Sequence, residues 1–131
     1  MKAAEGVFPE PEFPHVYIGG DTRASTPALV DAVRTALESL RVPYTDFGQI
    51  TTPMLHYLVA NHKLSPTPTS YVERLANSFL EFMNLITADH RKYERRMTVD
   101  CANGAAAIHM ADLAPRIAEH IKIDLINTKT T

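Results

Sequence analysis

A short glycine-containing turn carries the first side chains that could bind a ligand. Gly19 and Gly20 follow an apolar, β-branched stretch, and Asp21, Thr22 and Arg23 come next. A turn between a strand and a helix can present backbone N–H groups to a phosphate. This turn has neither the full GxGxxG spacing of a dinucleotide-binding turn nor the lysine of a P-loop. The plainer interpretation is a structural turn in which Asp21 and Arg23 connect neighbouring loops.

The remaining reactive side chains are scattered along the chain. Cys101 lies in an apolar stretch and is expected in the core rather than as a nucleophile. Ser25 and Ser78 have no GxSxG elbow and no nearby histidine and aspartate that would activate them. No two histidines stand at the i,i+4 spacing of a helical metal site, so surface or hydrogen-bonded roles are favoured over a metal site assembled from distant residues. The six histidines are His15, His56, His62, His90, His109 and His120.

Composition limits the class of protein. The chain has 131 residues, 45% of them apolar, which is enough for a modest core and argues against disorder. Thirteen basic and fifteen acidic residues give a net charge of −2, so nothing in the charge favours nucleic acid or an anionic membrane as partner. A single cysteine indicates a reducing, cytoplasmic setting. No apolar run approaches the roughly 20 residues that span a bilayer, and the N-terminus does not have the pattern of a signal peptide.

The elements that must position these residues alternate between strand and helix. Three prolines make residues 1–14 an extended lead-in. Residues 15–18 predict a buried strand that ends at the Gly19–Gly20 turn. A helix follows, with Thr26 as its expected cap and Pro27 in its first turn, and Pro43 ends it. Its apolar residues recur at helical spacing: Leu29, Val30, Val33, Leu37 and Leu40.

The second strand and the segment after it complete a β–α–β order. Residues 44–47 predict a strand that Gly48 closes, and this order indicates an α/β sheet with a crossover helix. In the following QITTPMLHY segment, Thr52 can cap a helix and Pro53 can open it. Local physics explains this helix start but gives no reason for His56 or Tyr57.

The rest of the chain continues the α/β pattern. Residues 64–69 predict a loop and residues 70–88 a helix, with an apolar stripe of Tyr71, Leu75, Phe79, Phe82, Met83 and Ile86. The charged run DHRKYERR at 89–96 is interpreted as a solvated helix end or linker. The sequence then predicts a strand at 97–101, a turn at 103–104 and a last strand at 121–126. Between the turn and the last strand it predicts a helix with Ile108, Leu113 and Ile117 facing inward. Pro115 is expected to kink or split this helix.

Three segments, in this order, resemble the α-D-phosphohexomutases, and most closely the eukaryotic phosphoacetylglucosamine mutase branch. They are IGGDTRASTPALVDAVRTAL, YTDFGQITTPMLHY and MTVDCANGAAA. The family pattern has a strand ending in GRDTRPSS, a DYG strand end, TTPQLHY and VDCANG. A spacer helix between the last two motifs is typical of the acetylglucosamine branch, and residues 70–88 supply it. Gly20, Ala24 and Met54 depart from the family's arginine, proline and glutamine.

The resemblance implies a fold and a reaction for a parent enzyme. The expected fold is α/β, with partial phosphohexomutase-type mixed sheet layers, packed helices and incomplete domains. Such enzymes interconvert N-acetylglucosamine 6-phosphate and 1-phosphate through a phosphoserine and a bisphosphate intermediate. Magnesium is their cofactor and an amino-sugar phosphate their substrate. The product serves UDP-N-acetylglucosamine synthesis.

The family's catalytic loops are not found in this sequence. We find no serine loop, magnesium loop, sugar loop or C-terminal phosphate loop. By resemblance, residues 15–94 are the later part of domain 1 and residues 95–131 the beginning of domain 2. The chain is then expected to be an inactive fragment that binds no magnesium and leaves strand edges and apolar faces uncovered. The side chains expected to support the parent's cleft are Asp21, Thr22, Arg23, Thr52 and His56.

Two other interpretations remain open from the sequence. The chain is either a non-catalytic module that binds a sugar phosphate or a protein, or a fragment of another hexomutase such as a phosphomannomutase or phosphoglucomutase. Binding of a hexose phosphate that is lost on Arg23→Ala would favour the module. The spacer helix argues against the other hexomutases, whose serine loop follows the TP motif closely.

Overall fold

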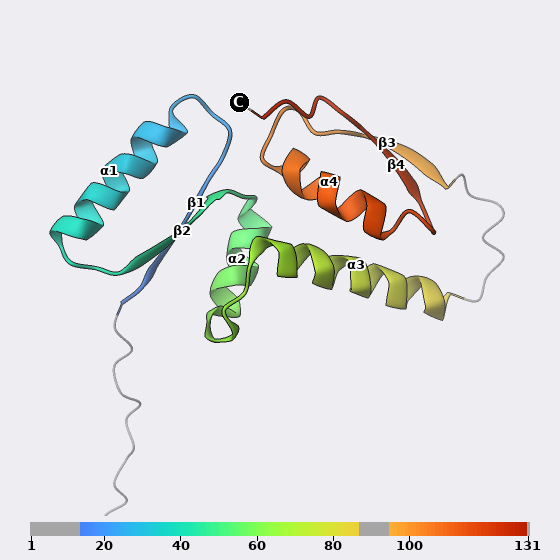
Figure 1. The fold of residues 1–131 in the computed structure, drawn as a ribbon, viewed down its shortest axis with the longest axis horizontal. Coiled ribbons are helices and arrows are strands. Elements are labelled where there is room, and N and C mark those ends of the chain that lie inside the picture. The colour runs from blue at the N-terminus through green and yellow to red at the C-terminus, as the bar shows by residue number, and fades with distance from the viewer. Residues whose placement is uncertain (1–13, 87–94, 131) are drawn as a thin grey trace, which may run out of the picture.

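The computed structural model describes residues 14–86 and 95–130 and has an α/β fold, as predicted (Figure 1). The described elements are β1 (Val16–Gly20), α1 (Thr26–Ser39), β2 (Tyr44–Gln49), α2 (Thr52–Ala60), the 3₁₀ turn η1 (His62–Leu64), α3 (Pro68–Leu85), β3 (Arg96–Asp100), α4 (Ala106–Arg116) and β4 (Lys122–Ile126). Most of the charged run at 89–96 lies outside the described residues. The predicted order of strands and helices is confirmed.

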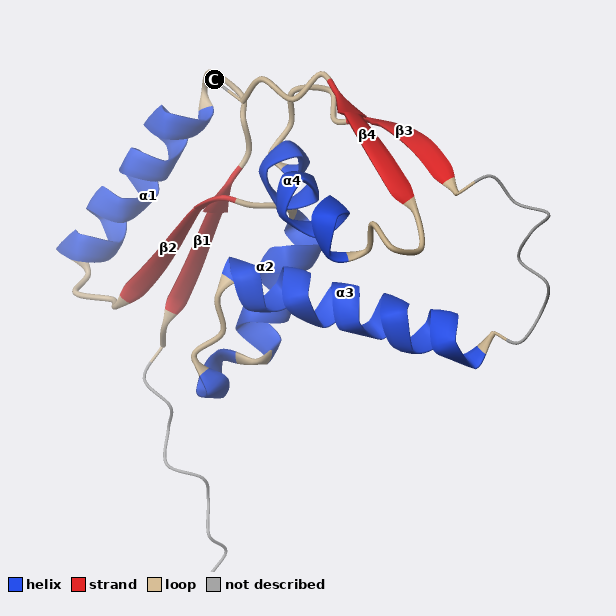
Figure 2. Cartoon of the chain, turned by 45° about the vertical axis from the view of Figure 1, so that its right-hand side comes forward, coloured by secondary structure: helices blue, strands red, loops and turns tan. Residues whose placement is uncertain are grey.

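The described strands form two separate parallel pairs. β1 pairs with β2, with Val16 opposite Tyr44, and β3 pairs with β4, with Arg96 opposite Lys122. Each pair is joined through one helix, so the chain contains two β–α–β units. Figures 1 and 2 show β1 and β2 between α1 and α2, and α4 between α3 and the β3–β4 pair.

The main apolar core forms where α2 meets α3. Met54 and Leu58 are fully buried on α2, and Val72 of α3 packs against them. Leu113 of α4 also contacts this cluster, so the core joins both β–α–β units. The cluster consists of Ile50, Met54, Leu58 and Val72, with Phe47, Leu55, Tyr57, Tyr71 and Leu113 around it.

The apolar stripe of α1 is largely uncovered. No residue of α1 is buried, and Leu29, Val33 and Leu40 are 63%, 44% and 72% exposed. On α3 the buried residues are Val72 and Ala76, whereas Leu75 and Phe82 of the predicted stripe are exposed. Helical spacing identifies an apolar face, but what covers that face depends on the rest of the fold.

Several predicted helix ends are corrected by the structure. Ser25, not Thr26, is the N-cap residue of α1, and Thr51, not Thr52, is that of α2; neither side chain makes a capping hydrogen bond. α3 begins at Pro68, before the predicted Ser70, because Thr67 and Ser70 form a capping box. α3 ends at Leu85.

The helix of the second β–α–β unit follows its predicted burial only in part. Ile117 is buried and Leu113 partly buried, as predicted, but Ile108 is 47% exposed. Pro115 does not split α4, which ends one residue later at Arg116. The turn after β3 places Ala102 and Asn103 at positive φ, 48° and 54°.

Candidate functional site

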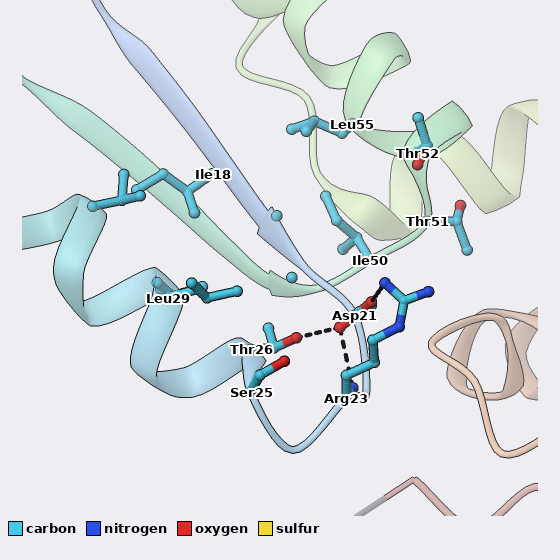
Figure 3. A pocket seen from close by; sticks show the side chains of 14 residues that line it. Ile18, Asp21, Arg23, Ser25, Thr26, Leu29, Ile50, Thr51, Thr52 and Leu55 are labelled. Carbon is cyan, nitrogen blue, oxygen red and sulfur yellow. Dashed lines mark hydrogen bonds and ion pairs between the residues drawn. The ribbon is translucent and has the colours of Figure 1, made fainter.

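The turn between β1 and α1 is held by its own side chains (Figure 3). One carboxylate oxygen of Asp21, Oδ1, accepts hydrogen bonds from the Thr26 hydroxyl and from the Arg23 backbone N–H, the latter at 3.1 Å. The other, Oδ2, lies 3.1 Å from Nη1 of Arg23. The Arg23 side chain is 83% exposed and that of Asp21 44%. The turn therefore fixes Asp21 and leaves the Arg23 guanidinium accessible.

These contacts also set the charge of the turn. The hydrogen bond from Thr26 lowers the pKa of Asp21, and the Arg23 N–H lowers it further. Asp21 is therefore ionised at neutral pH. It balances the charge of Arg23 within the same turn.

Neighbouring side chains pack so closely against the two faces of β1 that neither of its two glycines has room for a side chain. A Cβ atom at Gly19 would lie 2.7 Å from Cγ1 of Ile50, and one at Gly20 would lie 2.8 Å from Cγ2 of Thr26. The Thr26 methyl group therefore takes the space beside residue 20, while its hydroxyl holds Asp21. The family arginine at position 20 does not fit this arrangement unless Thr26 shifts.

A cavity of about 410 Å³ lies beside this turn (Figure 3). Its apolar wall consists of Ile18, Leu29, Val30, Val33, Ile50 and Leu55. Its polar side chains are Asp21, Arg23, Ser25, Thr26, Thr51 and Thr52. The cavity thus joins the tip of the turn to the first turn of α2.

The structure brings together most of the predicted site residues. Asp21, Arg23 and Thr52 line this cavity. Thr22 lines an adjacent one of about 380 Å³, which Asp21 and Arg23 also border. His56 lines neither cavity and is exposed on α2. The cavity reaches only the first turn of that helix, as far as Leu55.

The adjacent cavity contains an ion pair that was not predicted as part of the site. Arg34 of α1 binds Asp46 of β2 through its Nε and Nη2 atoms, with Nε 3.0 Å from Oδ2. The Asp46 side chain is only 12% exposed. Burial raises the pKa of Asp46, but the Gly48 N–H and Arg34 outweigh it, so the pKa lies below its ordinary value. No sequence signal singled out this pair, because its two residues come from different elements.

The described residues do not form a magnesium site. Residues 14–86 and 95–130 contain no group of three or more histidine, cysteine or acidic side chains placed to hold a metal ion. Asp21 and Asp46 are each neutralised by an arginine, whereas Mg²⁺ requires free oxygen ligands. The side chains of the described residues therefore do not fit the magnesium ion that the resemblance implies.

The histidines and the cysteine have structural surroundings. His15 hydrogen-bonds Thr45 Oγ1 at 2.9 Å, and His62 hydrogen-bonds the Val59 carbonyl at 2.9 Å. His109 Nε2 lies 3.3 Å from the carbonyl oxygen of Gln49 and so connects α4 with the end of β2. Cys101 is buried, as predicted. His90 lies outside the described residues.

None of the helices in the described ranges has the length and apolarity that crossing a membrane requires.

A family model matches most of the chain. It describes the phosphoglucomutase/phosphomannomutase α/β/α domain I and matches residues 2–90. This range includes the glycine turn, α1, β2, α2 and α3.

Curated relatives extend the match to the second unit. Phosphoacetylglucosamine mutase 1 of Schizosaccharomyces pombe is 33% identical over 124 residues, which cover 88% of this chain and 24% of that protein. The human phosphoacetylglucosamine mutase is 30% identical over 117 residues, covering 86% of this chain and 21% of its own length. The chain thus spans less than a quarter of these two relatives.

Solved structures of mutases have the same fold. The Aspergillus fumigatus N-acetylphosphoglucosamine mutase, crystallised with GlcNAc-6P and magnesium, superposes with a TM-score of 0.76 at 28% identity, over 92% of this chain and 25% of that one. An N-acetylglucosamine-phosphate mutase in its substrate complex gives a TM-score of 0.73 at 31% identity, over 88% and 22%. Sequence motifs, family model and fold agree, and the chain belongs to the phosphoglucomutase/phosphomannomutase family of α-D-phosphohexomutases, in which it is similar to the phosphoacetylglucosamine mutases.

Proposed function

We propose that this chain is a section of a phosphoacetylglucosamine mutase and contributes scaffold rather than catalytic groups. The observation that carries the proposal is the extent of the similarity. Mutases of this one specificity match 86–88% of the chain in sequence, and their crystal structures superpose on 88–92% of it. Similarity over both β–α–β units favours this branch over a phosphoglucomutase or phosphomannomutase, in agreement with the spacer helix α3.

The parent enzyme interconverts N-acetylglucosamine 6-phosphate and 1-phosphate for UDP-N-acetylglucosamine synthesis. Its phosphoserine and magnesium ligands lie outside these 131 residues. In this proposal residues 15–94 belong to the first domain and residues 95–131 begin the second. A cytoplasmic location is supported by the free, buried Cys101.

The residues of the glycine turn shape the cleft of the parent. Asp21 holds the turn, and the exposed guanidinium of Arg23 supplies positive charge at the mouth of the cavity. Thr52 borders the same cavity from α2. Thr22 borders the adjacent cavity, and His56 lies on the exposed face of α2.

The isolated chain is expected to be inactive. Phosphoryl transfer needs a group that accepts the phosphoryl and a cation that offsets its charge. The described residues provide no acidic cluster for the cation. Pure chain should therefore give no magnesium-dependent turnover of N-acetylglucosamine 6-phosphate in a coupled assay, and measurable turnover would overturn the proposal.

The test of the scaffold role is a chimera. These 131 residues replace the matched region of the S. pombe mutase, and the same assay is applied. An active chimera supports the proposal, and a soluble, folded but inactive chimera contradicts it. A second measurement is the mass of the native polypeptide, detected in source cells through a peptide from residues 71–91. A species several times heavier than 14.6 kDa is expected.

The exposure of Arg23 favours one alternative, a free-standing module that binds a sugar phosphate. A native species of 14.6 kDa would support it. Such a module should bind N-acetylglucosamine 6-phosphate in calorimetry, and Arg23→Ala should abolish the binding. Arg41→Ala is a matched control, because Arg41 is exposed but borders neither cavity of the turn.

A further inference from the structure

The end of β2 contains a bulge beside the candidate site. Ile18 lies opposite Asp46, but two residues further along β1 the opposite residue is Gln49, three further along β2. The extra residue is accommodated at Gly48, whose φ is 68°. A Cβ atom there would meet nothing within 4 Å, so the backbone conformation alone requires glycine. Bulges of this kind bend a strand and are common next to active sites.

Two side chains hold this bulge. Oδ1 of Asp46 accepts the Gly48 N–H at 2.7 Å. Its other oxygen, Oδ2, accepts from Nη2 and Nε of Arg34 on α1, with Nε at 3.0 Å. The Asp46 side chain is only 12% exposed, so water competes little for these contacts. Arg34 therefore fixes the carboxylate, and the carboxylate fixes the bulge.

The bulge sets the course of the chain between β2 and α2. Directly after it, the Ile50 N–H donates to the Gly20 carbonyl at 3.1 Å, which ties this segment to the end of β1. Residues 50–52 then line the cavity beside the glycine turn (Figure 3). One wall of the candidate site thus depends on the backbone at Gly48.

The same segment carries the seat of α4 from the second β–α–β unit. Since a carbonyl oxygen only accepts, Nε2 of His109 donates to the Gln49 carbonyl, at 3.3 Å. Ile50 belongs to the apolar cluster that Leu113 contacts. His109 and Leu113 are four residues apart and so lie on one face of α4. That face rests on the residues immediately after the bulge.

We propose that Arg34 and Asp46 are positioning residues of the mutase site. By holding the bulge at Gly48, they fix the cavity wall at residues 50–52 and the seat of α4 together. They act through the backbone rather than by contact with a substrate. The catalytic consequence rests on the proposed function, whereas the coupling of the two units does not.

A second contact between α1 and β2 provides a matched control. The Tyr44 hydroxyl, at the start of β2, donates to Oε1 of Glu38 on α1 at 2.8 Å. Neither residue borders the two cavities of the site. Tyr44→Phe therefore removes a polar contact between the same helix and strand but leaves the bulge intact.

The first test follows the 131-residue chain by NMR. Gly48→Ala should shift the ring signals of His109 and speed amide exchange of Ile50 by about tenfold or more, because alanine disfavours a positive φ. His120 is the internal reference, since its ring contacts Phe79 of α3 instead, and its signals should stay. Gly48→Asn should resemble the parent chain, because asparagine tolerates the left-handed conformation.

Substitutions of the ion pair should reproduce this pattern. Arg34→Met and Asp46→Ala should shift the His109 signals, Arg34→Lys should shift them less, and Tyr44→Phe should leave them unchanged. The inference is overturned if His109 stays unchanged in folded variants of Gly48 and Arg34. Equal shifts of His109 and His120 would also overturn it, because they would indicate a general loss of structure.

The second test measures kinetics in the active chimera. Arg34→Met should lower kcat/KM for N-acetylglucosamine 6-phosphate by about tenfold and raise KM, because a displaced wall misplaces the substrate. A mere loss of stability lowers the amount of folded enzyme and the apparent kcat, but it leaves KM unchanged. Arg34→Lys should restore part of the loss, and Tyr44→Phe should have no effect.

The two proposals can fail separately. An active chimera whose KM does not respond to Arg34→Met retains the proposed function and removes the positioning role. An inactive chimera, made from a chain in which Gly48→Ala shifts His109 but not His120, retains the coupling through the bulge and removes the mutase role.

Discussion

The two β–α–β units share one plan but are stabilised differently. The first has helices on both sides of its strands and borders the apolar cluster around Met54 and Leu58. In the second, four of the five residues of β3 are exposed, and polar contacts join the ends of the strands. Asp100 accepts hydrogen bonds from the Ala102 N–H and the Asn127 side chain, and Asn103 accepts one from the Lys129 N–H.

This difference indicates that the second unit depends on the first. Its own buried residues are small, apart from Ile117, and α4 reaches the main core through Leu113. Polar contacts that are open to water contribute modestly, whereas burial of large apolar side chains contributes most of the stability. We therefore expect the two units to unfold together.

The largest effect is expected from Met54→Ala. Met54 is fully buried, and the cavity left behind should lower the free energy of unfolding by about 2–5 kcal/mol in urea titration. Val59→Ala is the control on the same helix, since Val59 is 40% exposed and should change stability by about 0.5 kcal/mol or less. If Met54→Ala left amide exchange in β3 and β4 unchanged, the stability of the second unit would not depend on the first.

The next effect concerns the close contacts of the first unit. Gly20→Ala should destabilise the chain by about 1–3 kcal/mol, because the added Cβ meets the Thr26 methyl group at 2.8 Å. Thr26→Ser removes that methyl group and keeps the hydroxyl that holds Asp21. A double-mutant cycle should therefore show coupling of about 0.5 kcal/mol or more. Strictly additive effects would show that the turn relaxes without involving Thr26.

A smaller effect, of opposite sign, is expected in the second unit. Ala102 has a φ of 48°, where a Cβ atom is unfavourable, so Ala102→Gly should stabilise by about 0.5–1 kcal/mol. Ala111→Gly in α4 is the control and should destabilise by about 1 kcal/mol, because glycine is a poor helix former. Thermal unfolding of both variants would measure this, and equal losses would contradict the role of the left-handed turn.

The smallest change in stability per side chain is expected when the aspartates are protonated at low pH. Asp21 and Asp46 in the first unit, and Asp100 and Asp124 in the second, have pKa values below the ordinary range. Their stabilising contribution is complete above the unfolded-state pKa of about 4 and is lost as pH falls through the lower folded-state values. The temperature of the midpoint of thermal unfolding should therefore decrease as the pH is lowered from 5 to about 2.

Asp100→Asn measures how much the second unit contributes to this acid-induced decrease in stability. The amide oxygen still accepts a hydrogen bond but does not titrate, so the acid-induced decrease should become smaller. An unchanged decrease would show that the polar contacts at the end of β3 do not contribute to stability.

The order of elements could be predicted because each has a local signal. Pro27 and Pro53 lie in the first turns of α1 and α2, and apolar spacing marks the helices. The predicted strand ends were less accurate: Gly19 and Gly20 are the last two residues of β1 rather than a turn after it, and β2 runs past Gly48 to Gln49. The predicted start of α3 at Ser70 is wrong because Ser70 is the N3 residue of the capping box. Thr67, three residues earlier, is the N-cap residue. Local signals define elements, and their ends depend on which of two adjacent polar residues accepts the backbone hydrogen bond.

The candidate site was only partly predictable, because it depends on contacts between elements. The turn that contains Asp21 and Arg23 was identified, since its residues are adjacent in the chain. The ion pair of Arg34 with Asp46 was missed, because the crossover brings these residues together from a helix and a strand. His56 was grouped with Thr52 by motif, but the cavity ends at the first turn of α2. The exposure of Leu29 depends on what covers α1, which periodicity does not reveal.

The pairing of strands within each unit has a kinetic consequence. Val16 pairs with Tyr44 and Arg96 with Lys122, so each sheet closes over a single helix and its two connections. Short loops are closed quickly, and a topology dominated by such contacts folds faster than one with distant strand pairs. During synthesis, the strands of the first unit can thus pair before the second unit is complete. Docking of α4 through Leu113 onto the main core is then the late event that stabilises the second unit.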